Sequence, residues 1–412
     1  MPREYRPMWR GAKRALAVLG ATLVVVGGVT PEAAADDFRS HQWYLDGMKA
    51  PAMWKVSQGR GVIVGVVDTG INASLPELQG RVLPGKEVSN APTGSIRDGD
   101  GHGTNIAALI AGTGAKGGIQ GLVPEAKILP VKAVMNRVED SADGILSRAI
   151  RYAADHDAKV INVSLGPEGI PEYYEKTQQA VNYALKEGSL IFAAAGNGGE
   201  KGNHPNFPAS LPGVVGVAAI DRSATATKFS NHGDQVALAA PGEDIPWRCP
   251  EMTGRCNSWG TSQASALASA SAALIWAKHP DWTNYQVLRV MLQTAGAADG
   301  KVPSEYVGYG TIRPRKVLLD GEGNPGRPDV NPLLAREGAT EPKPSASAST
   351  SPSAKPNSPA PSDKPSDDKA VVESESDHDD SNNTVWIGAG AVVAVLAAVG
   401  VAVVVRRRGK GA

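Results

Sequence analysis

The sequence is poor in cysteine and carries no net charge. It contains only two cysteines, Cys249 and Cys256, in 412 residues, and no histidine pattern lies near them. This argues against a metal site, because such sites take several Cys or His ligands at regular spacing. The 42 basic and 42 acidic residues balance, and no basic cluster interrupts the central part of the chain. Nucleic acid is therefore not an expected partner.

The N-terminus is typical of a secretory signal peptide. Basic residues precede an uncharged stretch over 15–30, and three alanines ending at Ala35 precede Asp36. This order predicts a signal peptide at 1–35 that is cleaved after Ala35. An uncleaved N-terminal anchor is the alternative, although the 16 residues of 15–30 are short for a bilayer span. Either interpretation predicts an exported chain.

The C-terminus contains a predicted transmembrane helix. Residues 385–405 are 21 residues without a charge. At about 1.5 Å per residue they span roughly the 30 Å of a hydrocarbon core. Basic residues follow at once in the tail, 406–412. The positive-inside tendency places this tail in the cytoplasm and everything before the span outside, in a single-pass protein of the cell membrane. A buried soluble helix is the alternative.

A polar segment separates this span from the rest of the chain. Residues 321–384 are rich in Pro and Ser and then in acidic residues, a composition that cannot bury enough apolar surface to fold. We expect a disordered linker there. Export also exposes the folded part to oxidising conditions, so Cys249 and Cys256, seven residues apart, are expected to form a disulfide.

The central part of the chain alternates between strand-like and helix-like segments. The strand-like runs are apolar on both faces, as in a covered parallel sheet. Together the segments predict an α/β fold with a doubly wound, mostly parallel sheet and helices on both faces. In such sheets, sites form at the carboxyl ends of the strands. The predicted strands lie at 61–67, 127–134, 159–166, 189–197, 213–220 and 235–242, and the predicted helices at 105–111, 142–155 and 173–187.

Three polar residues stand where such segments begin or end. Asp68 follows the first apolar run, His102 stands at the entrance of an apolar helix, and Asn197 ends the run IFAAAGN. Asp68 and Asn197 each have a simple alternative, since an Asp shortly before Gly70 and the Gly196-Asn197 pair are typical of tight turns. At the carboxyl edge of a sheet, however, an asparagine amide could also donate to a developing oxyanion.

A run of serines lies in a predicted helix of small residues. Ser262 begins this helix, so its hydroxyl lies beside unpaired backbone N–H groups that can stabilise negative charge. Ser265, Ser269 and Ser271 lie further along the helix. We interpret these three as close packing of the helix against the sheet.

The candidates are informative in combination. Asp68, His102 and Ser262 stand in the order Asp, His, Ser, which is one of three known chain orders of the hydrolytic triad. The Gly-x-Ser-x-Gly elbow of α/β-hydrolases is absent, since Gln263 and Ala264 follow the serine. The sequence therefore disfavours a lipase or esterase of that fold.

These segments resemble the subtilisin family of serine proteases over residues 59–276. The matching blocks are VVDTG, HGTNIA, NVSLG, AAAGN and GTSQAS. The resemblance implies a serine endopeptidase that cleaves protein or peptide substrates without a cofactor, with Asp68, His102 and Ser262 as catalytic residues. It also implies an oxyanion hole formed by Asn197 and the backbone N–H of Ser262.

The resemblance extends to the substrate and to calcium. It implies that Ser164, Leu165 and Gly166 bind an extended substrate. Calcium sites are common in the family, but Asp98 and Asp100 are interpreted as part of a turn, so no metal ligand is expected.

Within this family the chain is most similar to the mycosins, the membrane-anchored proteases of type VII secretion systems. The similarity lies in QWYLDGMKAPAMWKVSQGRGV before the first strand, in the single C-terminal span and in the short tail. It implies association with a type VII secretion membrane complex. The alternative is a structural component of such a complex whose protease activity is dispensable.

Two features depart from the family pattern. Ala266 replaces the proline of G-T-S-x-A-x-P, which removes a fixed bend but no catalytic atom. Val62 lies only 26 positions after Asp36, which leaves too few residues for a folded inhibitory prodomain. We therefore expect an N-terminal extension at 36–60 to pack against a catalytic domain at 61–320.

Overall fold

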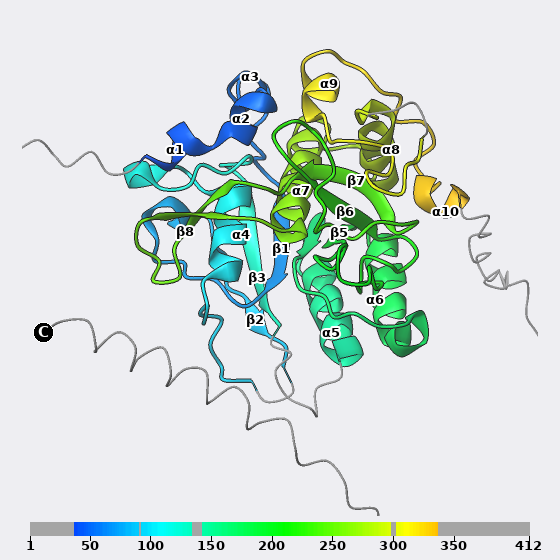
Figure 1. Ribbon diagram of the computed structural model, residues 1–412, viewed down its shortest axis with the longest axis horizontal. Coiled ribbons are helices and arrows are strands. Elements are labelled where there is room, and N and C mark those ends of the chain that lie inside the picture. Colours follow the sequence, from blue (N-terminus) through cyan, green and yellow to red (C-terminus); the bar gives the residue numbers. More distant parts are fainter. Residues whose placement is uncertain (1–36, 90–91, 134–141, 298–301, 337–412) are drawn as a thin grey trace, which may run out of the picture. The chain divides into compact units, whose positions relative to one another are not determined.

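A seven-stranded parallel sheet forms the centre of the fold (Figure 1). The computed structural model describes residues 37–89, 92–133, 142–297 and 302–336. The strands are β1 (Ile63–Asp68), β2 (Lys86–Glu87), β3 (Lys127–Lys132), β4 (Val160–Val163), β5 (Leu190–Ala194), β6 (Val215–Ile220) and β7 (Val236–Pro241). Their order in the sheet is β2-β3-β1-β4-β5-β6-β7, and every neighbouring pair is parallel.

The predicted parallel sheet is confirmed. Each of the six apolar runs coincides with one strand, although β1 extends one residue beyond its run to Asp68. All residues of β4, β6 and β7 are buried, as expected for strands covered on both faces. Strand β2 was not predicted. It has two residues in the segment PGKEVS, which contains a proline, a glycine and two charges and therefore has no apolar run.

Helices cover both faces of the sheet. Alternate residues of one strand face opposite sides, and β5 shows this: Phe192 packs in the cluster that contains the α4 and α7 residues, whereas Ile191 packs in the cluster that contains the α5 and α6 residues. On the second face, α5 and α6 lie side by side (Figure 1). The bounds are α4 (His102–Ala111), α5 (Ala142–Asp155), α6 (Glu175–Lys186) and α7 (Thr261–Lys278).

The N-terminal segment packs on the α4–α7 face, as expected. It forms α1 (Phe38–His41), α2 (Trp43–Gly47) and α3 (Ala50–Met53), drawn in blue in Figure 1. Tyr44 and Leu45 are fully buried in the same cluster as α4 and α7. The Gln42 side chain donates to the carbonyl of Gln120 at 2.7 Å and accepts from its N–H at 3.0 Å. The segment is thus an integral part of the core.

The folded unit continues beyond the predicted start of the linker at residue 321. Arg289, in α8 (Asn284–Thr294), donates to the backbone carbonyls of Arg327 at 2.7 Å and Val330 at 2.6 Å, and Leu333 is buried. The domain therefore extends at least to residue 336 instead of ending at 320. Composition could not reveal this, because hydrogen bonds from one arginine to backbone carbonyls depend little on which side chains the segment carries.

The remaining described elements are short helices and one hairpin. They are α8 (Asn284–Thr294), α9 (Pro314–Leu318), α10 (Pro332–Arg336), the 3₁₀ turns η1 (Pro76–Leu78), η2 (Ala115–Gly117) and η3 (Pro171–Tyr174), and the antiparallel strands β8 (Ile245–Arg248) and β9 (Arg255–Ser258).

The predicted membrane topology falls outside the described residues. The signal peptide at 1–35, the linker from residue 337 onward, the transmembrane helix at 385–405 and the tail at 406–412 all lie there. Among the helices that are described, none has the length and apolar character needed to cross a bilayer.

Candidate active site

Asp68 and His102 are in direct contact at the carboxyl edge of the sheet. Asp68 ends β1 with 1% of its surface exposed, and His102 is the first residue of α4. The Nδ1–H of His102 donates to Oδ1 of Asp68 at 2.7 Å, and the N–H of Thr69 binds the same oxygen at 2.7 Å. Gly103 permits this approach, because a Cβ there would lie 2.3 Å from the carbonyl oxygen of Gly70.

The carboxylate of Asp98 ties the start of α4 to the end of β1. It accepts hydrogen bonds from the Thr69 hydroxyl at 2.9 Å, the Gly101 N–H at 3.0 Å and the Thr104 N–H at 2.8 Å. Burial favours the neutral acid, but these bonds, those from Thr104 foremost, hold the pKa of Asp98 below its usual value. Asp98 thus serves the turn before the helix. No group of three or more His, Cys, Asp or Glu residues in the described ranges could hold a metal ion.

The environment of His102 favours its protonated form. Burial alone would lower the pKa of the imidazole, but the adjacent carboxylate of Asp68 and the charges of Asp100 and Asp98 raise it to about 9. The ring of Trp247 lies against the imidazole, with centroids 5.7 Å apart.

Ser262 lies at the same edge, with its hydroxyl turned toward Ser164. Its hydroxyl donates to the Ser164 carbonyl at 3.2 Å, and the Ser164 hydroxyl donates to the Ser262 carbonyl at 3.3 Å. The N–H of Ser164 in turn donates to the carbonyl of Val67, the neighbour of Asp68, at 3.4 Å. Within the described residues no hydrogen bond joins Ser262 and His102. The structure thus pairs Asp68 with His102. It places Ser262 next to Ser164, which follows β4, the strand beside β1.

Asn197 is exposed after β5 and is held by its side-chain oxygen. Oδ1 accepts from the N–H of Thr261 at 2.9 Å and from its hydroxyl at 3.0 Å, while that hydroxyl accepts from the N–H of Gly196 at 3.1 Å. The Nδ2 group donates no hydrogen bond to any described residue and is left available for a ligand. Thr261 was not singled out from the sequence, and its only signal there was its position next to Ser262.

A buried polar network joins α7 to β4. The hydroxyls of Ser265 and Ser269 donate to Oδ1 of Asn162 at 2.8 and 3.1 Å, and Nδ2 of Asn162 donates to the Ser164 hydroxyl at 2.8 Å. The packing interpretation of these serines was therefore incomplete: they are buried as expected, but they also position a polar side chain. Ser271 instead donates within its own helix. The missed signal was Asn162 itself, a polar residue inside an apolar run.

The residues predicted to bind substrate continue from β4. Ser164 is buried, Leu165 is half-buried and Gly166 is exposed. The side chain of Asn206 donates to the Gly166 carbonyl at 2.9 Å, and a Cβ on Gly166 would lie 2.1 Å from Oδ1 of Asn206. Glycine is therefore required for this contact. The segment thus runs from a buried to an exposed residue.

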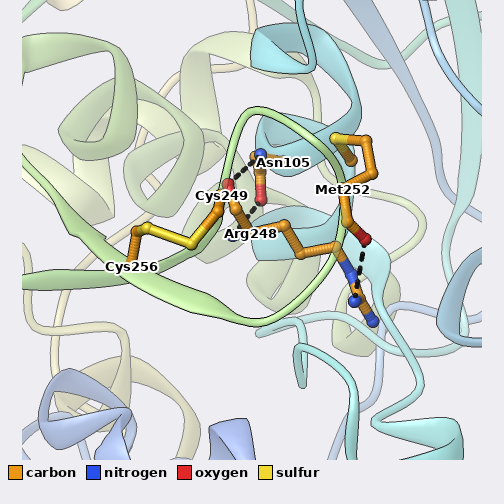
Figure 2. Close-up of a disulfide and its surroundings, with 5 residues drawn as sticks. All are labelled: Asn105, Arg248, Cys249, Met252 and Cys256. Carbon is orange, nitrogen blue, oxygen red and sulfur yellow. Dashed lines mark hydrogen bonds between the residues drawn. A yellow bond between two sulfur atoms is a disulfide. The ribbon is translucent and has the colours of Figure 1, made fainter.

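Cys249 and Cys256 form a disulfide in the structure. The bond closes the turn between β8 and β9 (Figure 2). Strand β9 ends at Ser258, four residues before Ser262, so the bridge lies in the segment that leads to the predicted nucleophile.

Comparisons with known proteins show which family the chain matches. The model of the subtilase family matches residues 59–310. Thermitase from Thermoactinomyces vulgaris is 37% identical over 244 residues, which are 58% of this chain and 83% of thermitase. Subtilisin E from Bacillus subtilis (strain 168) is 34% identical over 269 residues, 64% of this chain and 68% of that protein.

Solved structures with the same fold include those of MycP1 and MycP3. MycP1 from Mycobacterium smegmatis superposes with a TM-score of 0.60 at 28% identity, over 70% of this chain and 86% of that one. The MycP3 protease from the type VII (ESX-3) secretion system gives a TM-score of 0.58 at 29% identity, over 67% of this chain and 88% of that one.

Proposed function

The chain belongs to the subtilase family of serine endopeptidases, and we propose that it cleaves peptide bonds with Asp68, His102 and Ser262 as its catalytic triad. The observation that carries this proposal is the 2.7 Å hydrogen bond from His102 to Asp68, at the sheet edge where α7 brings in Ser262. This bond fixes the imidazole tautomer and leaves Nε2 to act on the serine hydroxyl.

The reaction proceeds through an acyl-enzyme. Oγ of Ser262 attacks the substrate carbonyl carbon while Nε2 of His102 takes the hydroxyl proton, and Asp68 stabilises the resulting imidazolium. His102 then gives the proton to the leaving amine, the C–N bond breaks and an ester to Ser262 remains. Water, deprotonated by His102, then attacks the ester carbonyl carbon. The bond from that carbon to Oγ of Ser262 breaks, His102 returns the proton to Oγ, and the acid product leaves.

Ser262 must first turn its hydroxyl from Ser164 to His102. The bond that it gives up is 3.2 Å long, which is long for a hydroxyl donor. A neutral hydrogen bond contributes only about 1 kcal/mol net. Rotation about one side-chain bond is therefore inexpensive compared with the barriers that enzymes lower.

Asn197 and the backbone N–H of Ser262 would bind the oxyanion. Thr261 holds Oδ1 of Asn197 and so directs Nδ2 outward, and the N–H groups at the start of α7 have no partner within the helix. Such preorganised donors act where charge develops in the transition state. Ser164, Leu165 and Gly166 would bind an extended substrate beside them, because this segment follows β4 to the exposed edge.

The enzyme is proposed to act on proteins outside the cytoplasm. The predicted signal peptide at 1–35, linker and transmembrane helix at 385–405 would attach the catalytic domain to the outer side of the cell membrane. The solved structure of MycP3 is named for a type VII secretion system. We therefore propose that this chain works with a secretion membrane complex of that type.

Substitution of the nucleophile tests this function. The Ser262→Ala chain should fold but lose cleavage of a protein substrate by a factor on the order of 10⁶, the magnitude that subtilisin itself shows. Asn197→Ala should retain more, with kcat lowered by about 10² to 10³, again as in subtilisin. Initial cleavage rates of both variants and of the unchanged chain, in membranes, measure this. Equal rates for Ser262→Ala and the unchanged chain would leave only a structural role.

A further inference from the structure

The hairpin β8–β9 connects the histidine helix to the serine helix. Its strands pair from Ile245 opposite Ser258 to Arg248 opposite Arg255, and the disulfide closes its turn. One end of the hairpin is continuous with the segment that enters α7 at Thr261. Arg248, at the other end of β8, hydrogen-bonds to Asn105 of α4.

Asn105 makes the main contact from α4. It lies one helical turn after His102 and is 1% exposed. Its Oδ1 accepts from the N–H of Arg248 at 2.8 Å, and its Nδ2 donates to the carbonyl of the same residue at 3.3 Å (Figure 2). Nδ2 also donates to the carbonyl of Gly101, which precedes His102, at 3.0 Å. One side chain thus joins the first turn of α4 to the end of β8.

Neighbouring contacts make the hairpin a rigid support. The guanidinium of Arg248 pairs with the fully buried carboxylate of Glu77 at 2.6 Å. Trp247 lies against the imidazole of His102. The sulfur of Met252, at the turn, would lie 2.7 Å from a Cβ on Gly101, so it packs directly against the start of α4.

We propose that Asn105 is a positioning residue, which uses the disulfide-closed hairpin to hold the imidazole of His102 in register with Ser262. This inference rests on the proposed function. The turn residues Pro250, Glu251, Thr253 and Gly254 are exposed, so the turn has little apolar burial to hold it in place. The disulfide supplies that constraint directly after Arg248.

Loss of this support should slow the chemical step more than it weakens substrate binding. A displacement of about 1 Å between reacting groups can cost about 10²-fold in rate. The segment at Ser164 to Gly166 has no part in the hairpin contacts described above. A fall in kcat with an unchanged KM is therefore the expected signature.

The test compares two buried asparagines in the full chain. Asn105→Ala should lower kcat for peptide cleavage about 10- to 100-fold with KM within twofold. Asn284→Ala is the matched control, because Asn284 is also buried and donates to two backbone carbonyls, those of Leu185 and Ser189, but at the start of α8. It should leave kcat unchanged at the same fraction folded. Equal kcat values for the two variants would overturn the proposal.

Reduction of the disulfide provides a second test of the proposal. The chain has no cysteine other than Cys249 and Cys256, so a mild reductant acts on this one bond. Reduction, verified by thiol alkylation, should lower kcat severalfold, and the double variant Cys249→Ser, Cys256→Ser should start low and not respond. Unchanged kcat after verified reduction would contradict the proposal. Cleavage that persists in Ser262→Ala would instead overturn the proposed function, and this inference with it.

Discussion

The two faces of the central sheet are built differently. On one face, α5 and α6 meet the strands through apolar side chains such as Ile145 and Val181. On the other, α7 meets them through apolar side chains and also through the hydrogen bonds of Asn162 with Ser265 and Ser269. A purely apolar contact tolerates small shifts, whereas a buried polar network fixes one arrangement. The polar network lies on the face that carries the candidate catalytic helices.

The sides of the helices that face away from the sheet also differ between α5 and α6 on one face and α7 on the other. Helices α5 and α6 have exposed polar residues, whereas every residue of α7 from Thr261 to Trp276 is buried. The N-terminal segment contributes to this cover, since the Ser57 hydroxyl donates to the carbonyl of Leu274 at 2.8 Å. The helix that carries the candidate nucleophile in its first turn is therefore covered on all sides from Thr261 to Trp276.

The largest expected difference is in the free energy of unfolding, and it concerns the N-terminal segment that helps to cover α7. Leu45→Ala removes a fully buried side chain from the N-terminal segment and should lower the free energy of unfolding by about 2–5 kcal/mol. Gln179→Ala, on the exposed side of α6, should change it by no more than about 0.5 kcal/mol. Denaturant unfolding of the purified chains measures both. Similar values for the two would show that the segment is not part of the core.

A smaller difference is expected from the buried polar groups. Asn162→Ala leaves the hydroxyls of Ser265 and Ser269 without their acceptor, so stability should fall by about 1–3 kcal/mol and kcat should fall as well. On the opposite face, Thr177 is buried and donates to the Asp143 carboxylate at 2.8 Å. Thr177→Val should cost about 1 kcal/mol and leave kcat unchanged. A loss of kcat in both variants would remove the functional contrast between the faces.

The smallest effect concerns the charge on His102. Its pKa of about 9 lies above the usual value of 6.5. The stabilisation of the fold by protonated His102 is therefore complete below pH 6.5 and is lost as the pH rises through about 9. Cleavage needs the neutral imidazole, so kcat/KM should rise with pH through a midpoint near 9. Asp100→Asn removes one of the charges that raise this pKa and should lower the midpoint. A pH profile with the same midpoint in both chains would contradict this.

The sequence predicted those parts of the site that end or begin apolar segments. Asp68, His102 and Ser262 could be proposed as candidates because each stands at such a boundary, in one chain order. Asn105 and Gln42 could not, because their partners, Arg248 and Gln120, are 143 and 78 residues away. Such contacts depend on how distant segments pack together, which the local periodicity of the sequence does not predict.

Local periodicity also decided how well each helix could be predicted. α5 has a clear apolar stripe and was predicted with the observed bounds. The run of small residues in α7 has no such stripe, because the helix is covered all round. It could be predicted only as a helix of small residues. That Asn162 accepts from the hydroxyls of Ser265 and Ser269 could be seen only in the structure.

Covalent labelling tests most directly whether the α4–α7 face activates Ser262. The chain would be treated with a fluorophosphonate, and the modified residue would be located by mass spectrometry after digestion. We predict a single adduct on Ser262, formed far more slowly in His102→Ala, with no adduct on Ser265 or Ser269. Absence of the adduct, or equal labelling in the His102→Ala chain, would contradict the account.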